Sequence, residues 1–415
     1  MLAMHTLANG LHVLIEPVHG VESIAIDLRL PAGSMHEEDI TDGCSTMLYE
    51  LLLRGTKHLD SKELTASLDR AGLQRSGGVG RRSLRLSGIT TPDNLETAIQ
   101  LMFDIAQHPR MDPQHVDPIR QLCLQSLEHL QDDPEEELGL ALLARHLPPP
   151  FHRNGLGTKS GLFRVTTACL EKLHAETCVP DGAVIALSGA VQNLEILELL
   201  TTVSAEWNGT APTPRAAGGA PRGRVLIPRN TAQVHLAITW DAPSLSAPRS
   251  PAERLACATL GGHTSSRLFQ EVRQRRSLCY SVGSRYASIR GQGRCTIRAG
   301  TTPDHAVELL DTCLSERGRL HETLQKQDID RARRSIVSAL AMQGESTRAR
   351  SARLASEMIE FGSYTTLDAR IKEFEAVSDA EVREQASAWA AQEPTIVAIG
   401  PVGCLPFEQW SPDWT

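Results

Sequence analysis

Apolar residues recur along this chain with two different spacings, which predict a mixture of strands and helices. Short stretches that alternate or are continuously apolar are typical of strands, and longer stretches with apolar residues at every third or fourth position are typical of helices. The mixed order predicts an α+β fold, in which helices cover mainly one face of a sheet. The expected strands are residues 11–18, 23–30, 83–89 and 234–240. The expected helices are residues 43–54, 61–71, 93–107, 114–131, 251–260, 266–275, 304–323, 326–343 and 379–391.

One pattern of strand, turn and helix occurs twice. Residues 82–93 read RSLRLSGITTPD, residues 294–304 read RCTIRAGTTPD, and an amphipathic segment follows each. In both copies the proline suits the first helical position and the threonine before it suits the N-cap. The Thr-Thr-Pro-Asp copies are 211 residues apart (301 − 90), about half the chain. We therefore expect an old internal duplication.

The segment between the two copies predicts a domain boundary. Residues 208–223 read NGTAPTPRAAGGAPRG, and this Ala-, Pro- and Gly-rich composition is typical of an exposed linker. A chain of 415 residues is also too long for one ordinary core. We therefore expect one domain over residues 1–207 and a second over residues 224–415.

Composition and charge narrow the class of protein. With 41% hydrophobic and 22% charged residues the chain is globular, and its net charge of −8 disfavours nucleic acid as a partner. The basic stretch 267–276 is therefore interpreted as a solvated helix face. The nine cysteines follow no metal or disulfide pattern, which indicates reduced thiols. There is no signal-peptide pattern and no apolar run that could span a membrane, so we expect a cytoplasmic protein without a membrane partner.

Polar residues interrupt one of the predicted helices. Residues 43–56 read GCSTMLYELLLRGT, and we expect this helix to be capped near Asp42 and to end at Gly55. At helical spacing it would bury Met47, Leu48, Leu51 and Leu52. The polar residues between them are Thr46, Tyr49 and Glu50.

This helix and its surroundings resemble the M16 (pitrilysin/insulinase) family of zinc metallopeptidases. The likeness extends over essentially the whole chain in order, at the length of the short two-domain bacterial members. It implies two homologous α/β sandwich domains of the LuxS/MPP-like type, arranged as half of a clamshell. The matching stretches are LANGLHVLI, LPAGSMHEED, DGCSTMLYELLLRGT, LQDDP (130–134), FHRNGLGT (151–158), VIALSGAV (184–191) and SSRLFQEVRQRRSLCYSV (265–282).

The residues that carry zinc chemistry in this family are replaced here. Active members use His-x-x-Glu-His on one helix, with both histidines on zinc and the glutamate as general base, and a later glutamate completes the site. The resemblance places Thr46 and Glu50 at the two histidine positions and Tyr49 at the base position. Gln125 or Ser126 falls at the distal ligand position. We therefore expect this chain to bind no zinc or other cofactor and to have no peptidase activity alone.

Two interpretations of the altered region stay open. Glu50 could work in another constellation, with His129 or His36, or it could be a polar residue that faces an internal cavity. The glycine-rich stretch GGVGRR (77–82) could shape the mouth of a cavity, but we expect a plain turn there.

The second half retains the family's other catalytic feature. Arg273 and Tyr280 are seven residues apart, at the spacing of the Arg/Tyr pair that hydrogen-bonds the substrate carbonyl and the oxyanion in active members. A guanidinium and a phenol are suitable donors for developing negative charge. The alternative is that Arg273 is a surface arginine and Tyr280 an inherited core aromatic.

The resemblance implies a subunit that depends on a partner. Some short members are heterodimers, in which one subunit carries the zinc motif and the other carries the Arg/Tyr pair. We therefore expect a non-catalytic subunit that binds peptide and supplies Arg273 and Tyr280 to the zinc site of an HxxEH-containing partner. The alternatives are a purely structural homodimer or scaffold, and an enzyme with altered chemistry based on Glu50.

Overall fold

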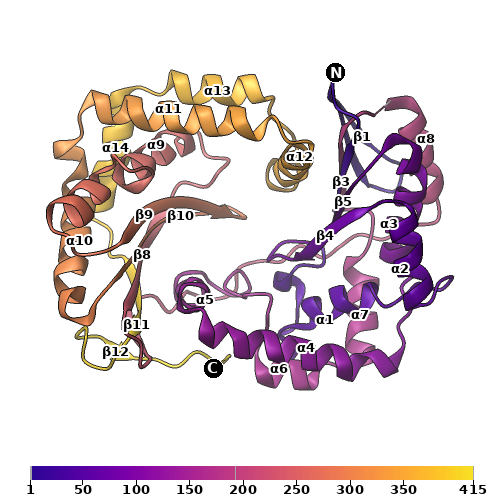
Figure 1. Cartoon of the computed structure of the whole chain (residues 1–415), viewed down its shortest axis with the longest axis horizontal. Coiled ribbons are helices and arrows are strands. Elements are labelled where there is room, and N and C mark those ends of the chain that lie inside the picture. The colour runs from indigo at the N-terminus through magenta and orange to yellow at the C-terminus, as the bar shows by residue number, and fades with distance from the viewer. Residues whose placement is uncertain (1, 192, 415) are drawn as a thin grey trace.

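The computed structural model describes residues 2–191 and 193–414, and within them two six-stranded mixed sheets face each other (Figure 1). The first sheet has the order β1-β2-β6-β3-β5-β4 and the second β12-β7-β11-β8-β10-β9. Strands of the first are β1 (Ala3–Thr6), β2 (His12–Pro17), β3 (Ile24–Leu30), β4 (Gln74–Val79), β5 (Leu84–Thr90) and β6 (Val184–Gly189). Strands of the second are β7 (Arg224–Pro228), β8 (Val234–Ala242), β9 (Ser281–Ile289), β10 (Gln292–Thr301), β11 (Thr395–Gly400) and β12 (Glu408–Gln409).

The two sheets repeat one topology, which confirms the expected duplication. In each sheet a parallel pair (β2 with β6, β7 with β11) is followed by antiparallel strands in the same order. Only the strands beside this pair differ, since β1 is antiparallel to β2 and β12 is parallel to β7. Pro92 and Pro303 each open a short 3-10 turn after the duplicated strand. Thr91 and Thr302 are the N-cap residues of these turns, but neither side chain forms a capping hydrogen bond. The α-helices that follow therefore begin at Leu95 and Ala306, two residues later than expected.

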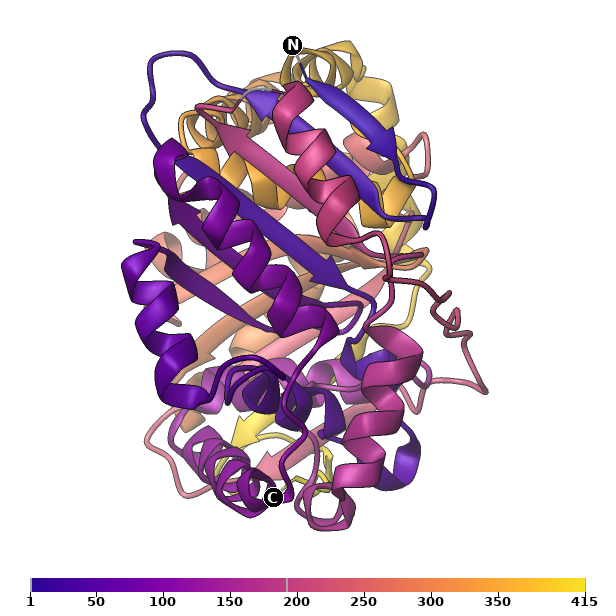
Figure 2. The same ribbon diagram turned by 90° about the vertical axis from the view of Figure 1, so that its right-hand side faces the viewer.

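Helices of each half cover the outer face of its own sheet. Figure 2 views the first half from outside, with helices lying across the strands. Helices of the first half are α1 (Cys44–Leu52), α2 (Ser61–Arg70), α3 (Leu95–Gln107), α4 (Val116–His129), α5 (Pro134–His146), α6 (Lys159–Arg164), α7 (Thr167–Thr177) and α8 (Asn193–Val203). Those of the second are α9 (Ser250–Gly261), α10 (Ala306–Thr323), α11 (Lys326–Gln343), α12 (Thr347–Phe361), α13 (Leu367–Ala376) and α14 (Asp379–Ala390). The predicted helix at 266–275 contains a π-helix over Phe269–Arg275.

Two helices cross between the halves, so the expectation that helices cover mainly one face is incomplete. Helix α12 of the second half packs on β3 and β6 of the first sheet, with Leu354 and Met358 in one apolar cluster with Val184 (Figure 1). Helix α5 of the first half packs on β8 and β11 of the second sheet. Each crossing helix covers the central strands of a facing surface, because these strands carry apolar residues on both faces.

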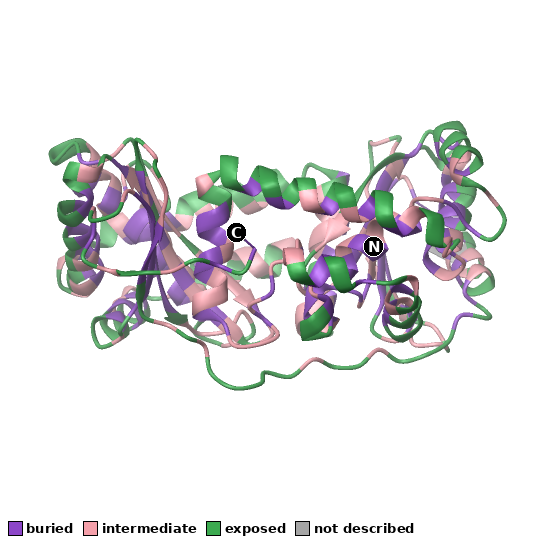
Figure 3. Cartoon of the chain, turned by 90° about the horizontal axis from the view of Figure 1, so that it is seen from below, coloured by how far each residue is buried: buried purple, intermediate pink, exposed green. Residues whose placement is uncertain are grey.

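The segment 208–223 joins the halves without secondary structure. Its residues are exposed or half-buried, and seen from below it runs along the outside of the molecule (Figure 3). The domain limits on either side of it stay a prediction. Among the described residues, no helix is both long enough and apolar enough to cross a membrane.

The glycine-rich stretch 77–82 is not a plain turn. Gly77, Gly78 and Val79 are the last residues of edge strand β4, and the turn into β5 comes only after them. A Cβ on Gly77 would lie 2.4 Å from the carbonyl oxygen of Arg85 and 2.8 Å from the Tyr49 hydroxyl, so the glycine is needed for close packing rather than for a turn.

Candidate functional site

Helix α1 is held at its N-terminus by a buried glutamate rather than by Asp42. The Glu37 carboxylate accepts the backbone N–H of Gly43 (2.9 Å) and of Ser45 (2.7 Å). Gly43 is the N-cap residue and has a left-handed φ of 101°. The helix ends at Leu52, three residues before Gly55. The expected Asp42 cap is wrong because a side chain from the preceding loop already satisfies the free N–H groups.

The three polar residues of α1 have different surroundings. Thr46 donates its hydroxyl hydrogen to the carbonyl of Gly155. Tyr49 and Glu50 are half-buried and line a cavity of about 280 Å³. The rest of this cavity is formed by Leu53, Leu68, Leu73, Arg75, Ser76, Leu86, Ser87, Met102 and Ile105. Thr46 is therefore hydrogen-bonded to a neighbouring loop, while Tyr49 and Glu50 face the cavity.

The donors around this cavity do not fit zinc. Burial, with the nearby charge of Glu50, raises the pKa of Tyr49, so this residue is a neutral phenol near pH 7 and no general base. The same two causes raise the pKa of Cys123 on α4 to about 11, which keeps its thiol protonated. Thr46 gives its hydroxyl hydrogen to a backbone carbonyl. One carboxylate among neutral donors falls short of the three strong ligands of a catalytic zinc site.

The other residues considered for this site lie apart from it. Gln125 is exposed on α4, about 200° around the helix from Cys123, the α4 residue that responds to Glu50. Ser126 is exposed and donates to the carbonyl of Leu122 in its own helix. Neither proposed histidine partner of Glu50 is among the residues that line the cavity.

Those two histidines have surroundings of their own. His129 is 82% exposed and lies 3.9 Å from Asp132. Burial, with Arg290 and Arg82 nearby, lowers the pKa of His36 to about 4. The structure therefore brings Glu50 together with Tyr49 and Cys123, and not with a histidine.

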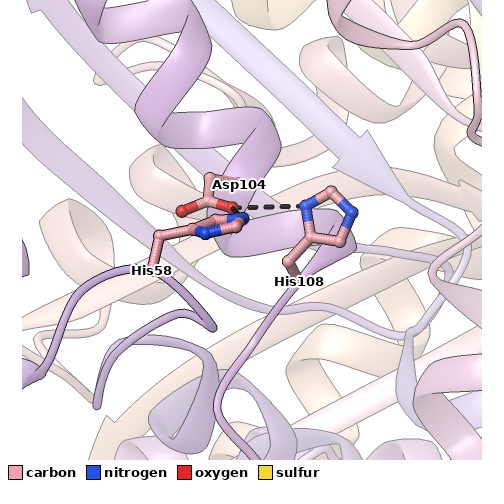
Figure 4. A group of neighbouring side chains, drawn as sticks. All are labelled: His58, Asp104 and His108. Atoms are coloured by element: carbon pink, nitrogen blue, oxygen red, sulfur yellow. Dashed lines mark hydrogen bonds and ion pairs between the residues drawn. The ribbon is translucent and has the colours of Figure 1, made fainter.

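One group of side chains with metal-ligand character lies elsewhere in the first half. Within residues 2–191 and 193–414, His58, Asp104 and His108 are the only such group, with ligand atoms within 4.8 Å of one another (Figure 4). His108 Nδ1 is 3.2 Å from Asp104, to which it is related by i,i+4 spacing, and His58 Nε2 is 3.8 Å away. His58 is 70% exposed, and the hydrogen bond between His108 and Asp104 at the end of α3 accounts for the arrangement.

The half-buried Arg273 and the exposed Tyr280 lie side by side. The Arg273 guanidinium carbon lies 4.8 Å from the ring centre of Phe269 and 4.9 Å from that of Tyr280, distances typical of cation–π contacts. Tyr280 is 84% exposed and immediately precedes edge strand β9. The two rings hold the guanidinium in place and leave its N–H groups available.

The charges around the pair favour this availability. Glu271 of the same π-helix contacts Arg275 (2.6 Å) and Arg267 (4.0 Å). Arg276 lies 3.4 Å from Glu308. None of the ion pairs between described residues involves Arg273. The stretch 267–276 is thus a helix face with paired arginines, apart from this one.

Comparison with known families agrees with the division of the chain into two halves. Residues 12–148 match the family described as "Insulinase (Peptidase family M16)", and residues 164–336 match "Peptidase M16 inactive domain". The two matches follow one another along the chain and include both the altered zinc helix and the Arg273/Tyr280 segment. This chain belongs to the M16 peptidase family.

Relatives and solved structures agree with this assignment. The "uncharacterized zinc protease" YmxG of Bacillus subtilis is 24% identical over 98% of this chain and 100% of its own length. An "uncharacterized zinc protease" of Streptomyces coelicolor is 25% identical, over 96% of this chain and 89% of its own. The crystal structure of a peptidase M16 inactive domain from Pseudomonas fluorescens has a TM-score of 0.87 and 19% identity, covering 99% of this chain and 100% of that one. A protease from Helicobacter pylori has a TM-score of 0.89 and 18% identity, covering 97% and 100%. These two structures are similar in fold.

Proposed function

We propose that this chain is the non-catalytic subunit of a heterodimeric M16-type zinc peptidase. It binds peptide in the cytoplasm and presents Arg273 and Tyr280 to the zinc site of a partner subunit that carries His-x-x-Glu-His. The zinc belongs to the partner, and this chain alone has no peptidase activity.

One observation carries the proposal: the chain has the Arg/Tyr pair of the family but lacks residues suited to bind zinc. The zinc helix has Thr46, Tyr49 and Glu50 at the ligand and base positions, and their donors do not suit zinc. Arg273 is held between two rings with no carboxylate partner, and the Tyr280 phenol is directed to solvent. This donor pair can act on a reaction only where another subunit brings the reacting carbonyl to it.

The chemistry asked of the pair is donation of hydrogen bonds. A guanidinium and a phenol aimed at a carbonyl oxygen stabilise the negative charge that develops when water attacks, and removing one such donor typically costs about 10²-fold in kcat. The free cysteines support a reducing compartment, since all nine are unpaired.

The test is reconstitution with an M16 chain that carries His-x-x-Glu-His from the same organism. We expect peptidase activity only when both chains are present, and Arg273→Ala or Tyr280→Phe should lower kcat about 100-fold while the two chains still co-purify. Arg276→Ala is the matched control, because Arg276 is an exposed neighbour paired with Glu308. Full activity of both variant complexes would refute the proposal and favour a purely structural role.

A further inference from the structure

The facing surface of the second sheet carries arginines without partners. On β10 the residues Arg294, Thr296 and Arg298 alternate with the buried Cys295, Ile297 and Ala299. Arg285 on edge strand β9 lies opposite Thr296. Helix α5 covers the neighbouring strands β8 and β11, so β9 and β10 are left open on this face.

These residues form one wall of a groove, here called the arginine groove and defined by Arg285, Arg294 and Arg298. The groove has a volume of about 650 Å³, and Leu142 and Leu143 of α5 provide its apolar side. No aspartate or glutamate is among its lining residues. Its surface therefore combines positive charge with an apolar strip, as expected for a site that takes an anionic chain rather than a single ion.

None of the three arginines is neutralised within the described chain. No ion pair or side-chain hydrogen bond joins Arg285, Arg294 or Arg298 to another described residue, and Nη1 of Arg294 is buried without a partner. Burial and the nearby Arg298 lower the pKa of Arg294 to about 10. Arg81 of the first half is close enough to Arg294 for its own pKa to be lowered as well. Bringing like charges together costs free energy, which a bound anion would recover.

The first sheet pairs its arginines with a buried carboxylate that the second sheet lacks. Counted back from the duplicated threonines, Asp27 opposite Ser87 in the first sheet corresponds to Ala237 opposite Arg298 in the second. Asp27 is buried and pairs with Arg29 (2.9 Å) and Arg85 (2.6 Å). At the same offset of 211 residues Arg85 corresponds to Thr296, and Arg298 corresponds to Ser87. The second sheet therefore lacks the carboxylate, and its arginines stand at other positions of the strand.

We propose that the arginine groove binds an acidic segment of the peptide substrate. This rests on the proposed peptide-binding function and adds a substrate class to it. Arg285 of β9 follows Tyr280 by five residues, and Tyr280 immediately precedes this strand, so the two are about 17 Å apart in extended backbone. Carboxylates about five residues from the scissile bond would therefore reach the groove while the bond itself lies at Tyr280.

The test measures binding by the purified full chain. The probe is a fluorescein-labelled twelve-residue peptide of alternating Glu and Ser, compared by anisotropy with an Asn/Ser peptide and a Lys/Ser peptide at low salt. We expect the acidic peptide to bind at least tenfold more tightly than the other two, and 0.5 M salt to remove the difference. Equal affinities for the acidic and neutral peptides would overturn the proposal.

Two variants distinguish binding in the arginine groove from a general effect of the protein's net charge. We expect Arg298→Glu to weaken binding of the acidic peptide at least tenfold. Arg334→Glu, an exposed arginine of α11 outside the groove and without an ion pair, should change it less than twofold. Equal losses in both variants would overturn the proposal, and so would tighter binding of a single-stranded oligonucleotide of equal charge. Melting temperatures confirm that both variants are folded.

The outcome is distinguishable from that of the proposed function. In one outcome, the reconstituted complex loses activity with Arg273→Ala but the chain shows no preference for acidic peptides. This result would refute the proposal for the arginine groove and leave the proposed function in place. In the other outcome, the chain binds acidic peptides through Arg298 but the activity of the complex does not depend on Arg273 and Tyr280. This result would refute the catalytic role and leave the proposal for the arginine groove in place.

Discussion

Two arginine-to-methionine substitutions on matching sheet faces are expected to change stability in opposite directions. Arg294→Met removes a guanidinium that has an unpartnered buried Nη1 atom and no carboxylate contact. Arg85→Met removes a guanidinium that contacts the buried Asp27 carboxylate at 2.6 Å. Methionine retains most of the apolar stem in both cases, so the comparison isolates the charge.

The magnitudes follow from the structure. Burial and Arg298 lower the pKa of Arg294 from its ordinary value of about 12.5 to about 10. A difference of about 2.5 pH units at about 1.4 kcal/mol each sets an upper limit of about 3.5 kcal/mol. The residue is charged on both sides of the unfolding equilibrium at pH 7, so this cost falls on the folded state. Since water reaches the open groove, we expect Arg294→Met to stabilise the chain by about 1–2 kcal/mol. Arg85→Met leaves a buried carboxylate with Arg29 alone and should cost roughly 3 kcal/mol.

The assay is thermal unfolding of both variants beside the wild type at pH 7. At about 2–4 °C per kcal/mol we expect Arg294→Met to raise the Tm by about 2–8 °C and Arg85→Met to lower it by about 6 °C or more. The stabilised variant should also bind the acidic peptide more weakly, because residues that bind a ligand often lower the stability of the free protein. A Tm that falls in both variants would refute the reasoning, because it would mean that Arg294 has a stabilising partner.

Three further predictions concern other sites. Burial raises the pKa of Glu253 to about 7, so the folded state favours the protonated carboxyl, and stability should be lost as the pH rises from about 4.5 through 7. Glu253→Gln keeps an acceptor for Trp389 Nε1 (2.8 Å) and should gain up to about 3 kcal/mol over wild type at pH 8 but little at pH 5 in denaturant unfolding; a pH-independent difference would count against this. Glu50→Ala should leave the zinc content of metal-exchanged protein unchanged by mass spectrometry, and a lost equivalent of zinc would reverse our conclusion about that site. Glu37→Ala deprives two buried N–H groups of α1 of their acceptor and should lower the free energy of unfolding by roughly 2–4 kcal/mol, more than Glu37→Gln; an unchanged Tm would contradict this capping role.

Periodicity predicted the elements whose pattern is local. The four expected strands and the helices around 61–71, 93–107, 326–343 and 379–391 are present within one or two residues of the predicted limits. Residues 74–79 escaped prediction because β4 is an exposed edge strand, and because Gly77 is required there by the close approach of the Tyr49 ring rather than by strand propensity. Helix α5 escaped because it is buried on more than one side, between its own half and the second sheet, so its apolar residues form no single stripe.

The candidate site divides in the same way. The sequence alone located α1 and the replacement of its zinc ligands, and it located Arg273 and Tyr280. It could not show that Glu37 holds the helix, because capping across six residues of irregular loop leaves no periodic signal. It also placed the distal ligand position at Gln125. This residue is exposed, on a side of α4 that faces away from Glu50.

By itself the sequence determined the α+β class and the internal duplication, and it predicted the loss of zinc ligands, because each of these depends on local spacing and residue type. Only the tertiary structure decided which charges meet. In it, α5 and α12 each pack on the sheet of the other half, β9 and β10 stay uncovered on their facing side, and Ala237 stands where the first half has Asp27. Whether an arginine is neutralised depends on residues from other strands and helices, because an ion pair requires contact in space.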